Sequence, residues 1–130
     1  MKLLELFRRR KNYNEADILN AGLDMAMEFG KNWLQPIQER LGKKFPALKN
    51  SRLDHYNKIC RGAMKAGQKF IYDTLAANQE PGHKIDSKDL QVDFEQWMVA
   101  RYPWVDQANL RRVFSQGMYY AWHDGYNSAD

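Results

Sequence analysis

The sequence predicts an all-α fold, a small helical bundle of about five helices. Three observations carry this prediction. Apolar residues recur every three or four positions along several segments, residues that favour helix N-caps precede most of those segments, and no segment shows a convincing strand-like alternation. The 130 residues, of which 44% are hydrophobic, suit one domain that spans 1–130 and buries a core of its own.

The N-terminal segment, residues 1–13, is amphipathic and basic. Leu3, Leu6 and Phe7 are spaced for one helical turn, and cationic residues follow at positions 8–11. One short turn binds a membrane only marginally. We therefore expect these apolar side chains to dock onto the helical bundle.

Two helices are expected next, over 15–29 and 33–42. Asn14 is placed as the N-cap of the first helix, because its side chain can accept a hydrogen bond from a free N–H of the first turn. Gly30 favours a break, and Asn32 can cap the second helix. We therefore predict that the chain does not run through this region as one straight helix.

A long helix is expected over 52–77, with Ser51 as its N-cap and a length of roughly 38 Å at 1.5 Å per residue. Small residues on its apolar stripe would let another helix approach closely. The stripe consists of Leu53, Tyr56, Cys60, Ala63, Met64, Gly67, Ile71 and Leu75.

Two further helices are expected over 88–101 and 107–124, after a loop at 78–86. Ser87 and Asp106 are their expected N-caps. The last helix should turn one apolar stripe toward the core. That stripe consists of Leu110, Phe114, Gly117, Met118, Ala121 and Gly125.

Positive charge is concentrated in one part of the chain, although the net charge is only +4. Residues 40–69 carry nine cationic side chains and one anionic side chain. Four of these cations lie on one side of the long helix and form what we call the basic ridge. A solvated helix face, which amphipathic bundles always have, is the first interpretation of this row, and a contact for an anionic partner, either a nucleic-acid backbone or an acidic protein surface, is the alternative. The basic ridge consists of Lys58, Arg61, Lys65 and Lys69.

The side of the last helix that faces away from its apolar stripe is the candidate partner-binding face. Arginine and aromatic rings with polar tips are enriched where proteins meet. The alternative is that Tyr119 and Tyr126 pack beneath the N-terminal segment or the 78–86 loop. The predicted face consists of Arg112, Gln116, Tyr119, His123 and Tyr126.

The sequence predicts no catalytic residue, no metal site and no cofactor. His55, His83 and His123 lack the i, i+4 spacing of a zinc-binding helix. The one Glu-x-x-His pattern, Glu80 to His83, falls on a predicted turn, where no helix can direct both side chains into a core. Cys60 lies on an apolar stripe, and a buried thiol is normally inert.

These features favour a non-enzymatic protein-binding module, such as an adaptor, a regulator or an immunity-type neutralising protein, that binds a protein partner or a second copy of itself. The alternative is a nucleic-acid-binding helical module that uses the basic ridge within 43–69. A second alternative is an enzyme with dispersed catalytic residues. The single cysteine, the lack of a membrane-length apolar run and a start too charged for a signal peptide favour the cytoplasm.

Overall fold

The computed structural model describes residues 13–130, and within this range the chain forms five α-helices and one short 3-10 helix. The same described residues contain no strand apart from a single parallel bridge between Ile85 and Ala129. The all-α fold class is therefore confirmed. The expected docking of the N-terminal apolar residues concerns positions 1–12, which lie outside the described residues.

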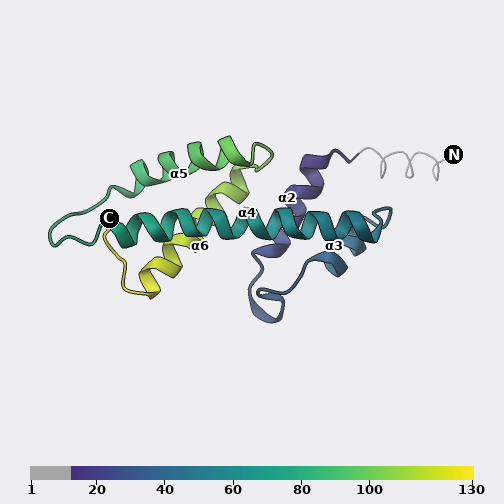
Figure 1. Ribbon diagram of the computed structural model, residues 1–130, viewed down its shortest axis with the longest axis horizontal. Helices are drawn as coiled ribbons and strands as arrows, with labels where there is room; N and C mark the ends of the chain where they lie inside the picture. Colours follow the sequence, from purple (N-terminus) through teal and green to yellow (C-terminus); the bar gives the residue numbers. More distant parts are fainter. Residues whose placement is uncertain (1–12) are drawn as a thin grey trace. The chain divides into compact units, whose positions relative to one another are not determined.

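The chain forms two compact units, Met1–Gly62 and Ala63–Asp130. Helix α4 (Asn50–Ala77) contributes its first turns to one unit and its later turns to the other. Figure 1 shows α4 as one continuous helix. The expectation of a single domain stays a prediction.

Helix α2 (Glu15–Ala26) begins where the sequence predicted it. The side chain of Asn14 accepts a hydrogen bond from the backbone N–H of Asp17 at 2.8 Å, which is the expected N-cap. The helix ends earlier than predicted, and the chain then turns through the 3-10 helix η1 (Gly30–Asn32). Gly30 has a φ of +83°, which glycine adopts without steric cost, so the predicted break is confirmed.

Helix α3 (Gln38–Lys44) corrects the prediction of a helix over 33–42 that Asn32 would cap. Leu34 has a φ of +61°, which a residue with a branched side chain rarely adopts and which no right-handed helix contains. Pro36 in turn disfavours helical backbone in the residue before it. These two constraints delay the start of the helix until after Pro36.

A close approach between α2 and α4 organises the first unit. A Cβ atom on Gly22 would lie 2.6 Å from the Sγ atom of Cys60, so only glycine fits at this crossing. The Cys60 thiol donates a hydrogen bond to the carbonyl of Leu19 at 3.3 Å. The largest fully buried side chains of this unit are those of Leu23, Met27, Ile37, Leu41 and Tyr56.

Helix α4 begins two residues before its predicted start, and Ser51 is not its N-cap. The carbonyl of Lys49 instead accepts hydrogen bonds from the N–H groups of Arg52 and Leu53. The apolar stripe predicted for this helix is confirmed, since every residue of that stripe is buried. Although α4 has 28 residues, neither it nor any other helix of residues 13–130 is apolar enough over a sufficient length to cross a membrane.

The second unit packs α5 (Ser87–Arg101) and α6 (Gln107–His123) with the later turns of α4. Asp106 caps α6 as predicted, because its carboxylate accepts a hydrogen bond from a backbone N–H of the first turn at 2.8 Å. Helix α5 is capped by Asp86 and not by Ser87, since the Asp86 carboxylate accepts from two N–H groups of the first turn.

Two glycines set the distance between the helices of this unit. A Cβ atom on Gly67 of α4 would lie 2.5 Å from Cγ1 of Val113 and 3.1 Å from Sδ of Met98. A Cβ atom on Gly117 of α6 would lie 2.9 Å from Cβ of Ile71. Helices α4 and α6 therefore pack so closely that neither position has room for a methyl group.

Gly67→Ala is expected to destabilise the protein by about 1–3 kcal/mol, because the added methyl group would overlap Val113. Gly62→Ala is the matched control, since Gly62 is exposed in the same helix and a Cβ atom there meets nothing within 4 Å. The control should gain up to about 1 kcal/mol from helix propensity. Urea unfolding measures both variants, and equal free energies of unfolding would contradict the packing.

Candidate functional site

An exposed group of aromatic rings lies on the C-terminal half of α6. The side chains of Tyr119 and Trp122 are 50% and 62% exposed, although both are large. Residues 119, 122 and 123 fall on one side of a helix. The ring centroid of Tyr119 lies 5.6 Å from that of Tyr120, 6.4 Å from that of Trp122 and 6.2 Å from that of His123. We call these four residues the aromatic cluster.

Two of the predicted partner-binding residues, Tyr119 and His123, come together in this cluster, and Arg112 is half-buried two turns earlier on the same helix. The expectation that Gln116 faces away from the core is wrong, since its side chain is only 4% exposed. Gln68 on α4 donates a hydrogen bond from Nε2 to Oε1 of Gln116 at 2.8 Å. An amide that is paired in this way can be buried beside an apolar stripe.

Tyr126 does not lie on the last helix, which corrects a second part of the predicted face. Helix α6 ends at His123, and Gly125 reverses the chain with a φ of +88°. The ring of Tyr126 then packs edge-on against Tyr72 of α4, with the centroids 5.2 Å apart. Tyr126 therefore holds the end of α6 against α4 and does not project from the same helical face.

Trp122 is the exposed residue that the sequence reasoning missed. It lies three positions after Tyr119, so the helical spacing that groups Tyr119 with His123 also includes position 122. The predicted partner-binding face did not include it. The signal was present in the sequence, but the outward direction of the indole became evident only from the structure.

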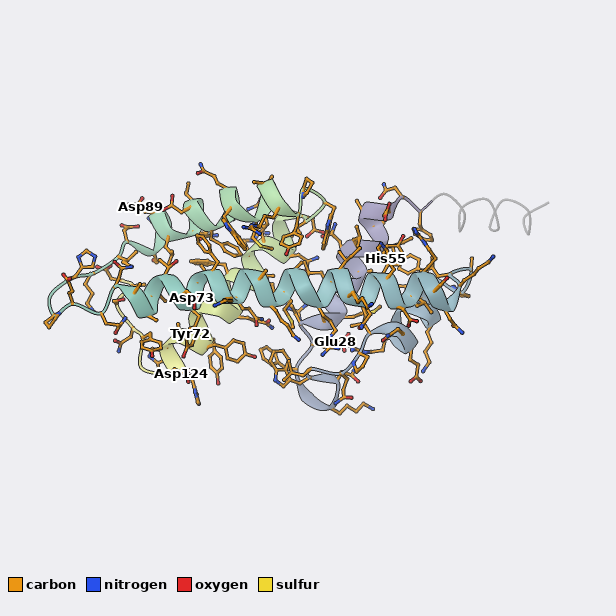
Figure 2. The ribbon with its side chains drawn as sticks, in the orientation of Figure 1. Glu28, His55, Tyr72, Asp73, Asp89 and Asp124 are labelled. Atoms are coloured by element: carbon orange, nitrogen blue, oxygen red, sulfur yellow. The ribbon has the colours of Figure 1, made fainter. Side chains whose placement is uncertain are left out.

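A hydrogen bond fixes the end of α6 next to the cluster. Tyr72 on α4 donates from its hydroxyl to Oδ2 of Asp124 at 2.5 Å, and Figure 2 shows the two residues side by side. This bond lowers the pKa of the Asp124 carboxyl below its ordinary value, and the adjacent His123 lowers it further. The same bond raises the pKa of Tyr72 to about 12, because an ionised phenol could not donate to the carboxylate.

A shallow hollow of ≈ 380 Å³ adjoins the aromatic cluster. Two exposed lysines of the basic ridge belong to it. Lys69 pairs with Asp73 at 2.6 Å, whereas Lys65 has neither a hydrogen bond nor an ion pair within residues 13–130. The hollow is lined by Lys65, Gln68, Lys69, Tyr72, Asp73 and Tyr120.

The other two members of the basic ridge belong to the first unit. Lys58 is exposed, whereas Arg61 is half-buried and donates from Nη2 to the carbonyl of Leu34 at 3.2 Å. The prediction of a mostly exposed row of cations beside buried Cys60 and Met64 is confirmed, with Arg61 as its least exposed member. Whether the basic ridge binds anything stays a prediction.

A cleft of ≈ 290 Å³ with largely apolar walls lies in the first unit. Tyr13, the first described residue, lines it. The guanidinium of Arg52 donates to the hydroxyl of Tyr56 at 2.5 Å and lies 3.9 Å from the carboxylate of Glu15. This cation is therefore already engaged by residues of the cleft itself, which makes the cleft a weaker candidate than the aromatic cluster.

The chemistry of Cys60 does not suit a nucleophile. Its side chain is fully buried, and this burial raises the pKa of the thiol to about 12. The thiolate is the nucleophilic form of cysteine, and it is scarce at such a pKa. Within the part of the chain that the structure describes, no three His, Cys, Asp or Glu side chains come together as metal ligands.

No protein-family model matches the chain, and neither does any curated protein or solved structure.

Tyr72→Phe is expected to lower stability in a pH-dependent way. Asp124 has a lowered pKa in the folded protein. Its contribution to the free energy of unfolding is therefore present above the ordinary carboxyl pKa of about 4 and is lost as pH falls through the lowered value. The contribution of Tyr72 is present below the ordinary phenol pKa of about 10 and is lost as pH rises through about 12. The stability difference between wild type and variant should therefore be largest between these two ordinary pKa values.

Urea unfolding at a series of pH values measures this difference. Tyr119→Phe is the matched control, because it removes a hydroxyl that makes no hydrogen bond within residues 13–130. A destabilisation by Tyr72→Phe that stays constant between about pH 2.5 and about pH 8 would show that the bond to Asp124 does not form in solution.

Proposed function

We propose that this chain is a non-enzymatic protein-binding module and that the aromatic cluster on α6 is its contact surface. The observation that carries the proposal is the joint exposure of Tyr119 and Trp122 on a helix whose opposite side is buried. Removing two large rings from water is strongly favourable, so a partner that covers them gains binding energy. Tyrosine and tryptophan are also the residue types most enriched at interface hot spots.

The contacts within the aromatic cluster support the same proposal. Contacts between rings connect Tyr119 to its three neighbours, and the bond between Tyr72 and Asp124 holds the end of the helix. A surface that is already ordered loses less conformational freedom when it binds.

The charge distribution favours a protein as the partner of this surface. Residues 63–130 contain seven lysines and arginines but nine aspartates and glutamates. A nucleic acid binds most strongly where cations are in excess, because its affinity depends on the number of phosphates that are neutralised. Nucleic-acid binding stays the second candidate function, since Lys58 and Lys65 of the basic ridge are exposed and have no ion pair within residues 13–130.

The proposal includes neither catalysis by a thiol nor an oxidising compartment, and the buried, free thiol of Cys60 is consistent with both points. A buried thiol with a raised pKa is a poor nucleophile. A lone free cysteine also suits a reducing compartment, where disulfides rarely persist.

Trp122→Ala and Tyr119→Ala should each weaken partner binding by at least about 30-fold, which is the loss expected at a hot spot. Folding stability should change little, because both side chains are largely exposed. The photo-reactive residue p-benzoylphenylalanine in place of Ser115, which is exposed on α6 one turn before Tyr119, would identify the partner by cross-linking in native cells. Calorimetry with the purified partner then measures the affinity, and a thermal melt measures the stability.

Val99→Ala is the matched control for these two variants. Val99 is an apolar side chain on α5 that is 45% exposed and lies outside the aromatic cluster. This variant should bind the partner as tightly as wild type. Affinities of the Trp122 and Tyr119 variants equal to that of the control, or a large loss of stability without a loss of affinity, would rule out the cluster as the contact surface.

A further inference from the structure

We propose that the protein segment bound by the aromatic cluster is acidic: a carboxylate pairs with Lys65 in the adjoining hollow, while an apolar side chain packs on Tyr119 and Trp122. This inference rests on the proposed function and specifies the chemistry of the partner. It follows from the placement of a cationic hollow directly beside exposed aromatic rings in one compact unit.

The hollow and the aromatic cluster form one continuous surface. Tyr120 lines the hollow, and its ring lies 5.6 Å from the ring of Tyr119. Tyr72 also lines the hollow and bonds to Asp124, the residue that follows His123. An extended peptide advances roughly 3.3 Å per residue. A segment of a few residues can therefore reach from the hollow to the rings.

Lys65 is the group in the hollow that selects an acidic segment. Its ammonium is exposed and has no ion pair within residues 13–130. The neighbouring polar groups are already engaged, since Lys69 pairs with Asp73 and Gln68 donates to Gln116. A carboxylate on the partner supplies both the opposite charge and the acceptor oxygens that an ammonium needs.

A peptide carboxylate suits this surface better than a phosphate backbone. Lys65 is a single uncompensated cation, whereas a nucleic acid gains affinity from a row of them. Asp73 lines the hollow, and Asp124 bonds to one of its tyrosines. These two carboxylates would repel a continuous run of phosphates more strongly than one acidic side chain, whose single charge is opposed by Lys65.

Two fluorescein-labelled peptides of roughly twelve residues test the inference on the full chain. Both carry the same tryptophan and leucine residues among serines and glycines, and a single aspartate near the tryptophan in one peptide is asparagine in the other. An oligouridylate of similar length is the third probe. Fluorescence anisotropy should show tighter binding of the acidic peptide, and this preference should diminish as salt rises, because salt screens exposed charges.

Lys65→Glu should weaken binding of the acidic peptide by about five-fold or more and leave the neutral peptide unaffected, since an attraction becomes a repulsion. Lys58→Glu is the matched control. It makes the same change in net charge at another exposed position of α4, outside the hollow. The control should leave the affinities of both peptides unchanged.

Trp122→Ala distinguishes failure of this inference from failure of the proposed function. If Trp122→Ala weakens the binding of both peptides while Lys65→Glu weakens the binding of neither, the contact surface stands and the acidic specificity is overturned. If neither peptide responds to Trp122→Ala, the proposed function is overturned as well. Preferred binding of the oligouridylate that both Lys65→Glu and Lys58→Glu abolish would overturn both in favour of nucleic-acid binding along the basic ridge.

Discussion

The close approach of α4 to its neighbours at small residues is the constraint on which the rest of the structure depends. Gly67 and Gly117 leave no room for a methyl group where α4 meets α6, and Gly22 has the same role where α2 meets Cys60. At this distance the neighbouring helices bury every residue of the apolar stripe of α4. The polar faces of the helix are consequently left at the surface, and the exposed position of Lys65 follows from the packing of the opposite face.

The same contacts determine what α6 presents to solvent. The hydrogen bond between the half-buried Gln68 and the buried Gln116 restricts the rotation of α6 about its axis, because another rotation would break it. With Gln116 and Gly117 turned toward α4, Tyr119 and Trp122 are left exposed. The bond from Tyr72 to the residue after the last helical turn keeps that end from fraying. The exposed rings are thus held in place by buried or bonded groups behind them.

Short-range geometry accounts for what the sequence could predict. Asn14 caps α2 by bonding to an N–H three residues on, which a local pattern reveals, and helical periodicity found Tyr119 in the same way. The errors have long-range causes. Leu34 adopts a positive φ, and its carbonyl accepts a hydrogen bond from the side chain of Arg61, 27 positions later in the sequence. Gln116 can be buried because it accepts a hydrogen bond from Gln68, which lies 48 positions earlier in the sequence. No periodic pattern contains either partner, so neither the late start of α3 nor the burial of Gln116 could be predicted from the local sequence.

Local charge, and not net charge, sets which partner the proposed contact surface favours. The chain as a whole carries +4, yet residues 63–130 contain more acidic than basic side chains. Within that unit, Lys69 is compensated by Asp73, whereas Lys65 stays uncompensated beside the exposed rings. A single cation attracts only a negative charge that lies close to it, because the attraction falls off over a Debye length of about 8 Å at physiological salt. A segment that carries a carboxylate at a fixed short distance from an apolar side chain can pair with Lys65 and cover the exposed rings at the same time. A polyanion can pair with Lys65 but leaves the rings exposed to water.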